Sequence, residues 1–227
     1  MSRPRFDFAA EVPAVTDLGR VHFIAIGGAG MSAVARLMLA AGVPVSGSDA
    51  KDSPTLAGLR DAGATVFVGQ RAEQVRGVDT VVVSSAIAED NVELVAARER
   101  GLRVLHRSQG LAALRGSRSV LAVAGANGKT TTTSMIVVAL RASGRDPAFA
   151  SGAEIPQEGT NADLGAGPYL VVEADESDGS FVVYGPDVAV VTNVQPDHLD
   201  FHGDLAGVEA AYRSFVDSMA AEGLLVA

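Results

Sequence analysis

The chain has 227 residues, and its 18 lysines and arginines against 27 aspartates and glutamates give a formal net charge of −9. This acidic balance argues against a broad nucleic-acid-binding surface, and the absence of cysteine excludes disulfides, thiolate metal sites and a thiol nucleophile. The first 19 residues lack a continuous apolar core, and no apolar run is long enough to span a bilayer, so we expect a cytoplasmic protein without membrane insertion.

Apolar runs and polar or glycine-rich turns alternate along the first half of the chain. After a loosely held leader, the pattern predicts strands at 21–26, 43–48, 65–68, 80–84 and 103–105, with helices at 31–41, 56–62, 92–100 and 109–114. Such alternation is typical of a parallel sheet covered by helices on both faces. The polar stretch 115–118 interrupts the pattern, so we expect one domain over residues 1–116 and a second over 117–227.

The second half begins again with an apolar strand at 120–124, a turn and a helix with its body at 134–140. Strands at 170–174 and 188–192 and a helix near 205–221 follow, and the polar, glycine-rich stretch 154–167 is expected to be a loop. Residues 222–227 predict a turn entering an apolar strand, which we interpret as a domain cut short. The expected fold is therefore α/β: a Rossmann-like parallel-sheet domain followed by an incomplete P-loop ATPase domain.

The first glycine-rich turn, "IGGAGMSAVA", contains the dinucleotide-binding pattern Gly28-x-Gly30-x-x-Ala33. It follows a predicted strand and opens a predicted helix, and Asp49 stands at the end of the next strand. This context favours a pyrophosphate at the helix N-terminus, although it does not choose between NAD and another nucleotide diphosphate. The alternative is that the glycines serve only close packing of strand and helix, and that Asp49 is a solvated acid.

A second phosphate-binding turn lies in the other half. Gly128-Lys129-Thr130 ends a Walker A loop, but Val123 stands where that motif has its first glycine, and the loop opens at Gly125 instead. The glycines still permit a sharp turn that aims backbone N–H groups at one point near a helix N-terminus. Lys129 would reach β- and γ-phosphates and Thr130 would offer its hydroxyl to Mg²⁺. An ordinary strand–turn–helix with an exposed lysine is the alternative.

Acidic and polar residues follow the next two strands of this half. Glu173 ends an apolar strand and can hold Mg²⁺ opposite Thr130, because ligands bind at the carboxyl ends of parallel strands. Asn193 and His198 follow the strand at 188–192. A solvated acidic loop and a structural histidine are the alternatives, but three strand ends that meet at one phosphate favour a functional site.

The segments "HFIAIGGAGMSAVA", "GSDAKDSPTLAGLRDAGATVFVG", "GANGKTTTT", "EADESDGSF" and "TNVQPDHLDFHGD" together resemble the Mur ligase family, in the family's order, from about residue 21 to the end of the chain. The resemblance is greatest to members that add L-alanine to UDP-N-acetylmuramate. It implies an ATP- and Mg²⁺-dependent amide ligase of peptidoglycan precursor synthesis that forms an acyl phosphate, and it explains the shortened loop as this family's ATP-binding loop.

The resemblance also implies residue roles. The ATP-binding residues would be Gly125, Ala126, Asn127, Gly128, Lys129, Thr130 and Thr131. The residues in catalysis would be Lys129, Asn193 and His198, and the Mg²⁺ ligands Thr130, Glu173 and His198. The UDP-sugar site would contain Gly28, Gly30, Met31, Asp49 and Asn161.

Three other functions remain open from the sequence: an NAD-type oxidoreductase, a related ligase acting on another muramoyl or folate-like substrate, and a nucleotide-binding module without catalysis. Asn127 and Gln70 stand where alanine-adding members usually have histidine, which leaves the amino acid open. We also expect the 227 residues alone to keep the UDP-sugar site but to show weak ATP affinity and no turnover.

Overall fold

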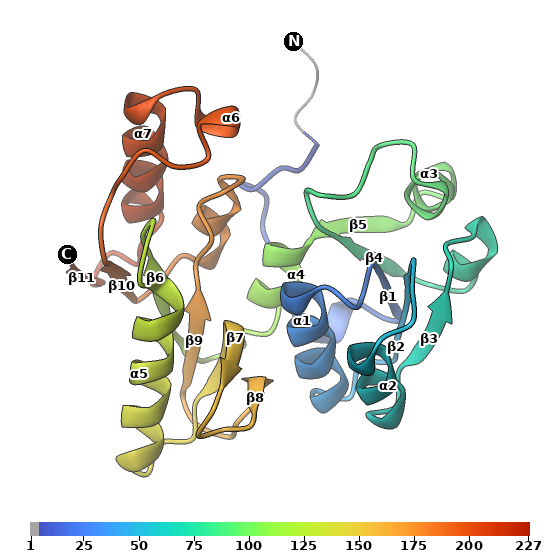
Figure 1. Cartoon of the computed structure of the whole chain (residues 1–227), viewed down its shortest axis with the longest axis horizontal. Helices are drawn as coiled ribbons and strands as arrows, with labels where there is room; N and C mark the ends of the chain where they lie inside the picture. Colours follow the sequence, from blue (N-terminus) through green and yellow to red (C-terminus); the bar gives the residue numbers. More distant parts are fainter. Residues whose placement is uncertain (1–4) are drawn as a thin grey trace. The chain divides into compact units, whose positions relative to one another are not determined.

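The computed structural model describes residues 5–227, which divide into two compact units (Figure 1). Unit 1 contains Val12–Gly116 with residues 5–6, and unit 2 contains Ser117–Ala227 with Asp7–Glu11. The first four residues of the expected leader lie outside the described residues. The end of the leader is not loose, because the apolar side chain of Leu18 is fully buried. None of the helices in residues 5–227 combines the length and apolar character needed to cross a membrane.

Unit 1 is a five-stranded parallel sheet in the order β3-β2-β1-β4-β5. Its elements are η1 (Val15–Asp17), β1 (Val21–Ile24), α1 (Ala29–Ala40), β2 (Val45–Asp49), α2 (Pro54–Asp61), β3 (Thr65–Val68), η2 (Ala72–Val75), β4 (Thr80–Val83), α3 (Val92–Glu99), β5 (Arg103–His106) and α4 (Arg107–Ala112). The strand order reverses at β1, which lies between β2 and β4. Ligands of such sheets bind at this reversal, beyond the carboxyl ends of the strands.

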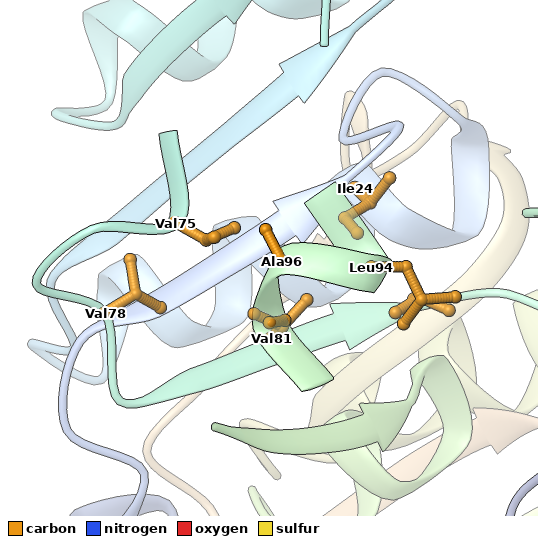
Figure 2. Packing of buried hydrophobic residues seen from close by; sticks show 8 residues of the cluster. Ile24, Val75, Val78, Val81, Leu94 and Ala96 are labelled. Atoms are coloured by element: carbon orange, nitrogen blue, oxygen red, sulfur yellow. The ribbon is translucent and has the colours of Figure 1, made fainter. Parts of the chain in front are cut away.

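The core of unit 1 fills the space between the sheet and its helices. Figure 2 shows part of it, where Val81 of β4 and Ile24 of β1 pack with Leu94 and Ala96 of α3. Every residue of β1 and β4 is buried. Strands covered on both faces need continuous apolar runs, which explains why these two segments show no alternation in the sequence.

Unit 2 is a six-stranded sheet in the order β11-β10-β6-β9-β7-β8, parallel except for β8 against β7. Its elements are β6 (Ser119–Ala124), α5 (Lys129–Ala142), β7 (Ala148–Ile155), β8 (Thr160–Asp163), β9 (Tyr169–Glu173), η3 (Ser180–Tyr184), β10 (Val188–Val191), α6 (Leu199–His202), α7 (Leu205–Asp217) and β11 (Leu224–Val226). In Figure 1, β9 and β10 flank β6, whose carboxyl end leads into α5. The α/β class expected from the sequence is confirmed.

The stretch 154–167 is not a simple loop, so that expectation was wrong. β7 extends to Ile155, and after a short turn the chain returns antiparallel as β8. Neither strand was predicted, because "AFASGAEI" is rich in small residues and lacks apolar alternation. Pairing with β9 makes β7 a strand, and Phe149 is fully buried there. At the other boundaries the differences are small: α7 ends at Asp217 and not at 221, and β1 ends at Ile24.

Candidate functional site

The loop between β6 and α5 has the conformation that its glycines predict. Gly125 has φ 140° and Gly128 has φ 88°, both in the region that side chains disfavour. A Cβ at Gly125 would run into the hydroxyl of Thr192 after β10. Val123, at the position of the missing first glycine, is fully buried in β6 and paired in register with Glu173. The turn therefore starts two residues later than a Walker A loop because Val123 belongs to the sheet.

Asn193 holds this loop from the end of β10. Its Oδ1 accepts a bond of 3.1 Å from the N–H of Asn127, and its Nδ2 donates to the Asn127 carbonyl at 2.8 Å. The hydroxyl of Thr192 donates to the same carbonyl at 2.6 Å, and the Ala126 N–H reaches the Asn193 carbonyl at 3.3 Å. The N–H groups of Ala126 and Asn127 therefore face Asn193.

The start of α5 supplies the remaining backbone donors. The helix is 14 residues long and begins at Lys129, and Gly128 at its N-cap provides no side-chain acceptor. Within residues 5–227, no side chain caps this helix. The first-turn N–H groups, from Lys129 to Thr131, carry the positive end of the helix dipole, which is an arrangement that favours an anion.

Lys129 is the first residue of α5, and its ammonium group lies over the loop. Nζ donates to the Gly125 carbonyl at 2.7 Å and to the two carboxylate oxygens of Glu176 at 3.0 and 2.9 Å. The side chain of Lys129 is 16% exposed and that of Glu176 only 2%. A partly buried cation therefore lies at the loop, and a more deeply buried carboxylate is paired with it.

Thr130 and Glu173 lie together as the sequence predicted. The Thr130 hydroxyl donates to Oε1 of Glu173 at 2.9 Å, and the N–H of Gly152 in β7 donates to Oε2 at 2.8 Å. Because Glu173 ends β9 directly beside β6, its carboxylate lies next to the first turn of α5. A hydroxyl and a carboxylate oxygen at this place are ligands that Mg²⁺ prefers.

His198 lies with two acids. One ligating atom each of Glu176, Asp197 and His198 lies within 4.8 Å of the others, and this is the one group of three or more such residues within the described part of the chain. His198 has φ 49°, which is rare for a side-chain-bearing residue and is a strain often found at functional sites. Sequence reasoning did not single out Glu176, and its only signal was its place in a run of acids after β9.

Tyr212 of α7 is a further residue that the sequence did not reveal. The residue is 5% exposed, and its hydroxyl lies beside the backbone of Gly125 in the loop after β6. Burial, and then the nearby carboxylates of Glu176, Asp197 and Asp175, raise the pKa of this phenol above its ordinary value. The sequence shows only a tyrosine on the apolar side of an amphipathic helix, and that pattern does not indicate that its hydroxyl lies near several carboxylates.

The first glycine loop lies in unit 1, between β1 and α1. Oδ2 of Asp49 accepts from the Gly27 N–H at 2.9 Å, and its Oδ1 accepts from the Ala50 N–H at 2.8 Å, so Asp49 ties the end of β2 to the loop. A Cβ at Gly30 would meet the guanidinium of Arg107. Met31 is buried, so only its backbone can face a ligand. Arg107 was not predicted, because it follows β5, 77 positions after Gly30 in the chain.

The predicted residues thus form two groups, each within its own unit. Gly28, Gly30, Met31 and Asp49 surround the loop after β1, and Gly125–Thr131, Glu173, Asn193 and His198 surround the loop after β6. Asn161, predicted with the first group, lies on β8 of unit 2.

Two family models match the chain, one in each half. A family model described as "Mur ligase family, catalytic domain" matches residues 20–118, and one described as "Mur ligase middle domain" matches residues 123–227. The chain is 57% identical over 213 residues to a UDP-N-acetylmuramate–L-alanine ligase of Renibacterium salmoninarum, which covers 94% of this chain and 46% of the relative. It is 51% identical over 225 residues to the ligase of the same name from Salinispora arenicola, and the match covers 99% of this chain and 44% of that relative. The chain therefore spans less than half the length of these curated relatives.

Solved structures show the same likeness. A UDP-N-acetylmuramate:L-alanyl-gamma-D-glutamyl-meso-diaminopimelate ligase from Neisseria meningitides matches with a TM-score of 0.84 at 32% identity, over 92% of this chain and 70% of that one. A UDP-N-acetylmuramate–alanine ligase from Thermotoga maritima matches with a TM-score of 0.81 at 32% identity, over 88% of this chain and 47% of that one.

Proposed function

The chain belongs to the Mur ligase family, and from that premise we propose that it forms the nucleotide- and substrate-binding part of an ATP-dependent ligase that adds L-alanine to UDP-N-acetylmuramate. In this reaction the muramoyl carboxylate attacks the γ-phosphorus of ATP, and the bond to the β-γ bridging oxygen breaks to release ADP. The amine of alanine then attacks the acyl phosphate and displaces inorganic phosphate. The product is an amide in a peptidoglycan precursor.

The loop after β6 carries this proposal. Its residues fit a polyphosphate because the first turn of α5 is uncapped, the left-handed glycines leave room for close backbone approach, and Lys129 adds a cation at the loop. We assign Lys129 to the β- and γ-phosphates. Asn193 acts by holding Ala126 and Asn127, so that the loop keeps one shape while phosphate is transferred.

The Thr130–Glu173 pair fits the Mg²⁺ that accompanies ATP. When bound, Mg²⁺ neutralises charge that develops on the transferring phosphoryl group. Thr130 would offer its hydroxyl and Glu173 a carboxylate oxygen, while the Gly152 N–H keeps the other oxygen in place. His198 lies with Glu176 and Asp197, a group that could itself hold a metal ion, and we keep it as the third Mg²⁺ ligand, directly or through water.

Unit 1 would hold the UDP moiety. The loop after β1 lies where the strand order reverses, and α1 begins there without a side-chain cap within the described residues. The N–H groups near Gly28, Gly30 and Met31 would face the pyrophosphate. Asp49 would stay near the uridine end, and Asn161 of unit 2 would approach the muramoyl group.

The choice of amino acid rests on the sequence relatives. The two solved structures differ in the printed substrate, alanine or a tripeptide, yet both match at 32% identity. The curated relatives at 51–57% identity are all named for L-alanine. A related ligase acting on a muramoyl peptide is thus the second candidate, and an oxidoreductase is not favoured because it leaves the loop after β6 without a use. A cytoplasmic location stays a prediction.

The proposal is tested by isothermal titration of the 227-residue chain with UDP-N-acetylmuramate, UDP and NAD. We expect UDP-N-acetylmuramate to bind more tightly than UDP and NAD not to bind. Phosphate release is then measured with UDP-N-acetylmuramate, Mg·ATP and either L-alanine or the tripeptide, in the chain alone and in a form extended to the length of the relatives. Alanine-dependent release by the extended form supports the proposal, whereas tighter binding of NAD or release only with the tripeptide contradicts it.

A further inference from the structure

Each N–H of the Lys129 ammonium group has an acceptor inside unit 2. Nζ donates to the Gly125 carbonyl at 2.7 Å and to both carboxylate oxygens of Glu176 at 3.0 and 2.9 Å. A lysine ammonium has three donors, so these contacts use all of them. A phosphate can reach this lysine only when at least one contact is given up.

Glu176 is the acceptor that has to yield. Gly125 belongs to the loop itself, and the next residue, Ala126, is tied to the end of β10 through its N–H. The Glu176 carboxylate is a side chain with the same charge as the incoming phosphate, so the two repel each other at close range. Carboxylate and phosphate oxygens also accept the same charge-assisted hydrogen bonds, so they compete for one donor.

We propose that Glu176 is a positioning residue that holds Lys129 in place of a nucleotide phosphate and competes with phosphate for its ammonium group. The inference rests on the proposed function of the loop after β6. Burial makes the competition strong, because only 2% of the Glu176 side chain and 16% of the Lys129 side chain is exposed. Charges shielded from water interact more strongly than charges at the surface.

The surroundings of Glu176 add to the free-energy cost of releasing it from Lys129. A carboxylate oxygen of Asp197 lies within 4.8 Å of a ligating oxygen of Glu176, so a released Glu176 stays next to another negative charge. A ligand must therefore gain enough from Lys129 and the first turn of α5 to offset this repulsion.

The test measures how the 227-residue chain binds inorganic tripolyphosphate without divalent cations, by isothermal titration. Glu176→Gln keeps the shape of the side chain and removes its charge. We expect it to bind tripolyphosphate about tenfold more tightly, or by ~1.4 kcal/mol, since the ammonium group no longer has a charged acceptor competing with phosphate. The control Asp200→Asn removes an equal charge from the exposed start of α6, and we expect less than about a twofold change.

Thermal unfolding of the same variants separates competition from a purely structural role. Glu176→Gln leaves Lys129 charged without its counter-ion, so its midpoint should fall while its affinity for tripolyphosphate rises. A folded Glu176→Gln protein that binds tripolyphosphate equally or more weakly overturns the inference. If Glu176→Gln does not unfold cooperatively, Glu176→Asp, which retracts the carboxylate, should show a smaller tightening in the same direction.

A double-variant cycle identifies the partner. In a Lys129→Ala background, Glu176→Gln should no longer tighten binding, because the contested ammonium group is gone. If Glu176→Gln still tightens binding in the Lys129→Ala background, the Glu176 carboxylate acts only by repelling the ligand, and the inference is contradicted. If the unsubstituted chain and Glu176→Gln both fail to bind tripolyphosphate, the proposed function of the loop fails. Binding by the unsubstituted chain without tightening by Glu176→Gln rejects only the role of Glu176.

Discussion

The hydroxyl of Thr130 donates a 2.9 Å hydrogen bond to Oε1 of Glu173, although the two residues are 43 positions apart in the chain. The contact follows from the pairing of β6 with β9, in which Val123 lies opposite Glu173. The helix that follows β6 therefore starts beside the last residue of β9, and a hydroxyl meets a carboxylate where the proposed Mg²⁺ would lie.

Glu173→Gln should weaken the Mg²⁺ dependence of nucleotide binding. The substitution keeps an oxygen for Thr130 but removes the charge that attracts the cation. Mg²⁺ should strengthen ADP binding, and we expect the Mg²⁺ concentration at which half of this strengthening is reached to rise at least about tenfold in the variant. Titration of ADP at several Mg²⁺ concentrations measures this shift. ADP binding without Mg²⁺ is the internal control and should change little, and an unshifted Mg²⁺ dependence rules out Glu173 as a ligand.

Lys129→Ala should abolish most binding of Mg·ATP and leave UDP-N-acetylmuramate binding unchanged. The two glycine loops belong to different units, so loss of one cation at the second loop does not alter the first. The variant should also be less stable by about 3–5 kcal/mol, because it leaves the Glu176 carboxylate buried and unpaired. Equal loss of both ligands by a folded variant contradicts the two-site assignment.

Asn193→Ala should loosen the loop after β6. It removes two of the three hydrogen bonds to the Asn127 backbone and leaves the one from the Thr192 hydroxyl, with an expected loss of stability of about 1–2 kcal/mol. Hydrogen exchange at Ala126 and Asn127 should accelerate, and ADP should bind roughly tenfold more weakly. The matched control is Asn127→Ala, which removes only a side-chain bond to Gln195 and should leave loop exchange near that of the original chain.

Gly30→Ala should weaken UDP-N-acetylmuramate binding without unfolding unit 1. The new methyl group would meet the Arg107 guanidinium and displace it across the loop where the pyrophosphate is proposed to bind. We expect a loss of at least about tenfold in affinity by isothermal titration. Gly58→Ala in α2 adds a methyl group against the flexible end of Arg36 and should bind normally. Normal binding by Gly30→Ala would place the ligand elsewhere.

Tyr212→Phe should make the folded chain lose less of its free energy of unfolding at high pH than the original chain does. Burial and nearby carboxylates raise the pKa of Tyr212 above 10.0 in the folded chain, so above pH 10 the unfolded phenol loses its proton while the folded one keeps it. The unfolded state then binds fewer protons, and stability falls as pH rises. Urea unfolding at pH 8 and pH 11 should show a smaller decline for the variant. Its hydroxyl contributes at most one hydrogen bond, to the Gly125 backbone, so stability at pH 8 should not decrease by more than about 1 kcal/mol. Equal declines would contradict the assignment.

The sequence by itself determined the features that depend on neighbouring residues. The alternation of apolar strands and helices predicted the α/β class, and glycine positions located both loops, because a sharp turn needs backbone angles that glycine permits. Glu173 could be predicted beside Thr130, since parallel strands that carry ligands end at one edge of a sheet.

The tertiary structure alone decided which distant side chains meet. The pairing of Lys129 with Glu176 spans 47 positions and depends on how the chain leaves β9, where several acids of similar appearance follow one another. The place of Tyr212 depends on how α7 packs, and β7 forms a strand only through its pairing with β9. Local periodicity carries no information about strand register or helix packing, so these contacts could not be found from residue patterns.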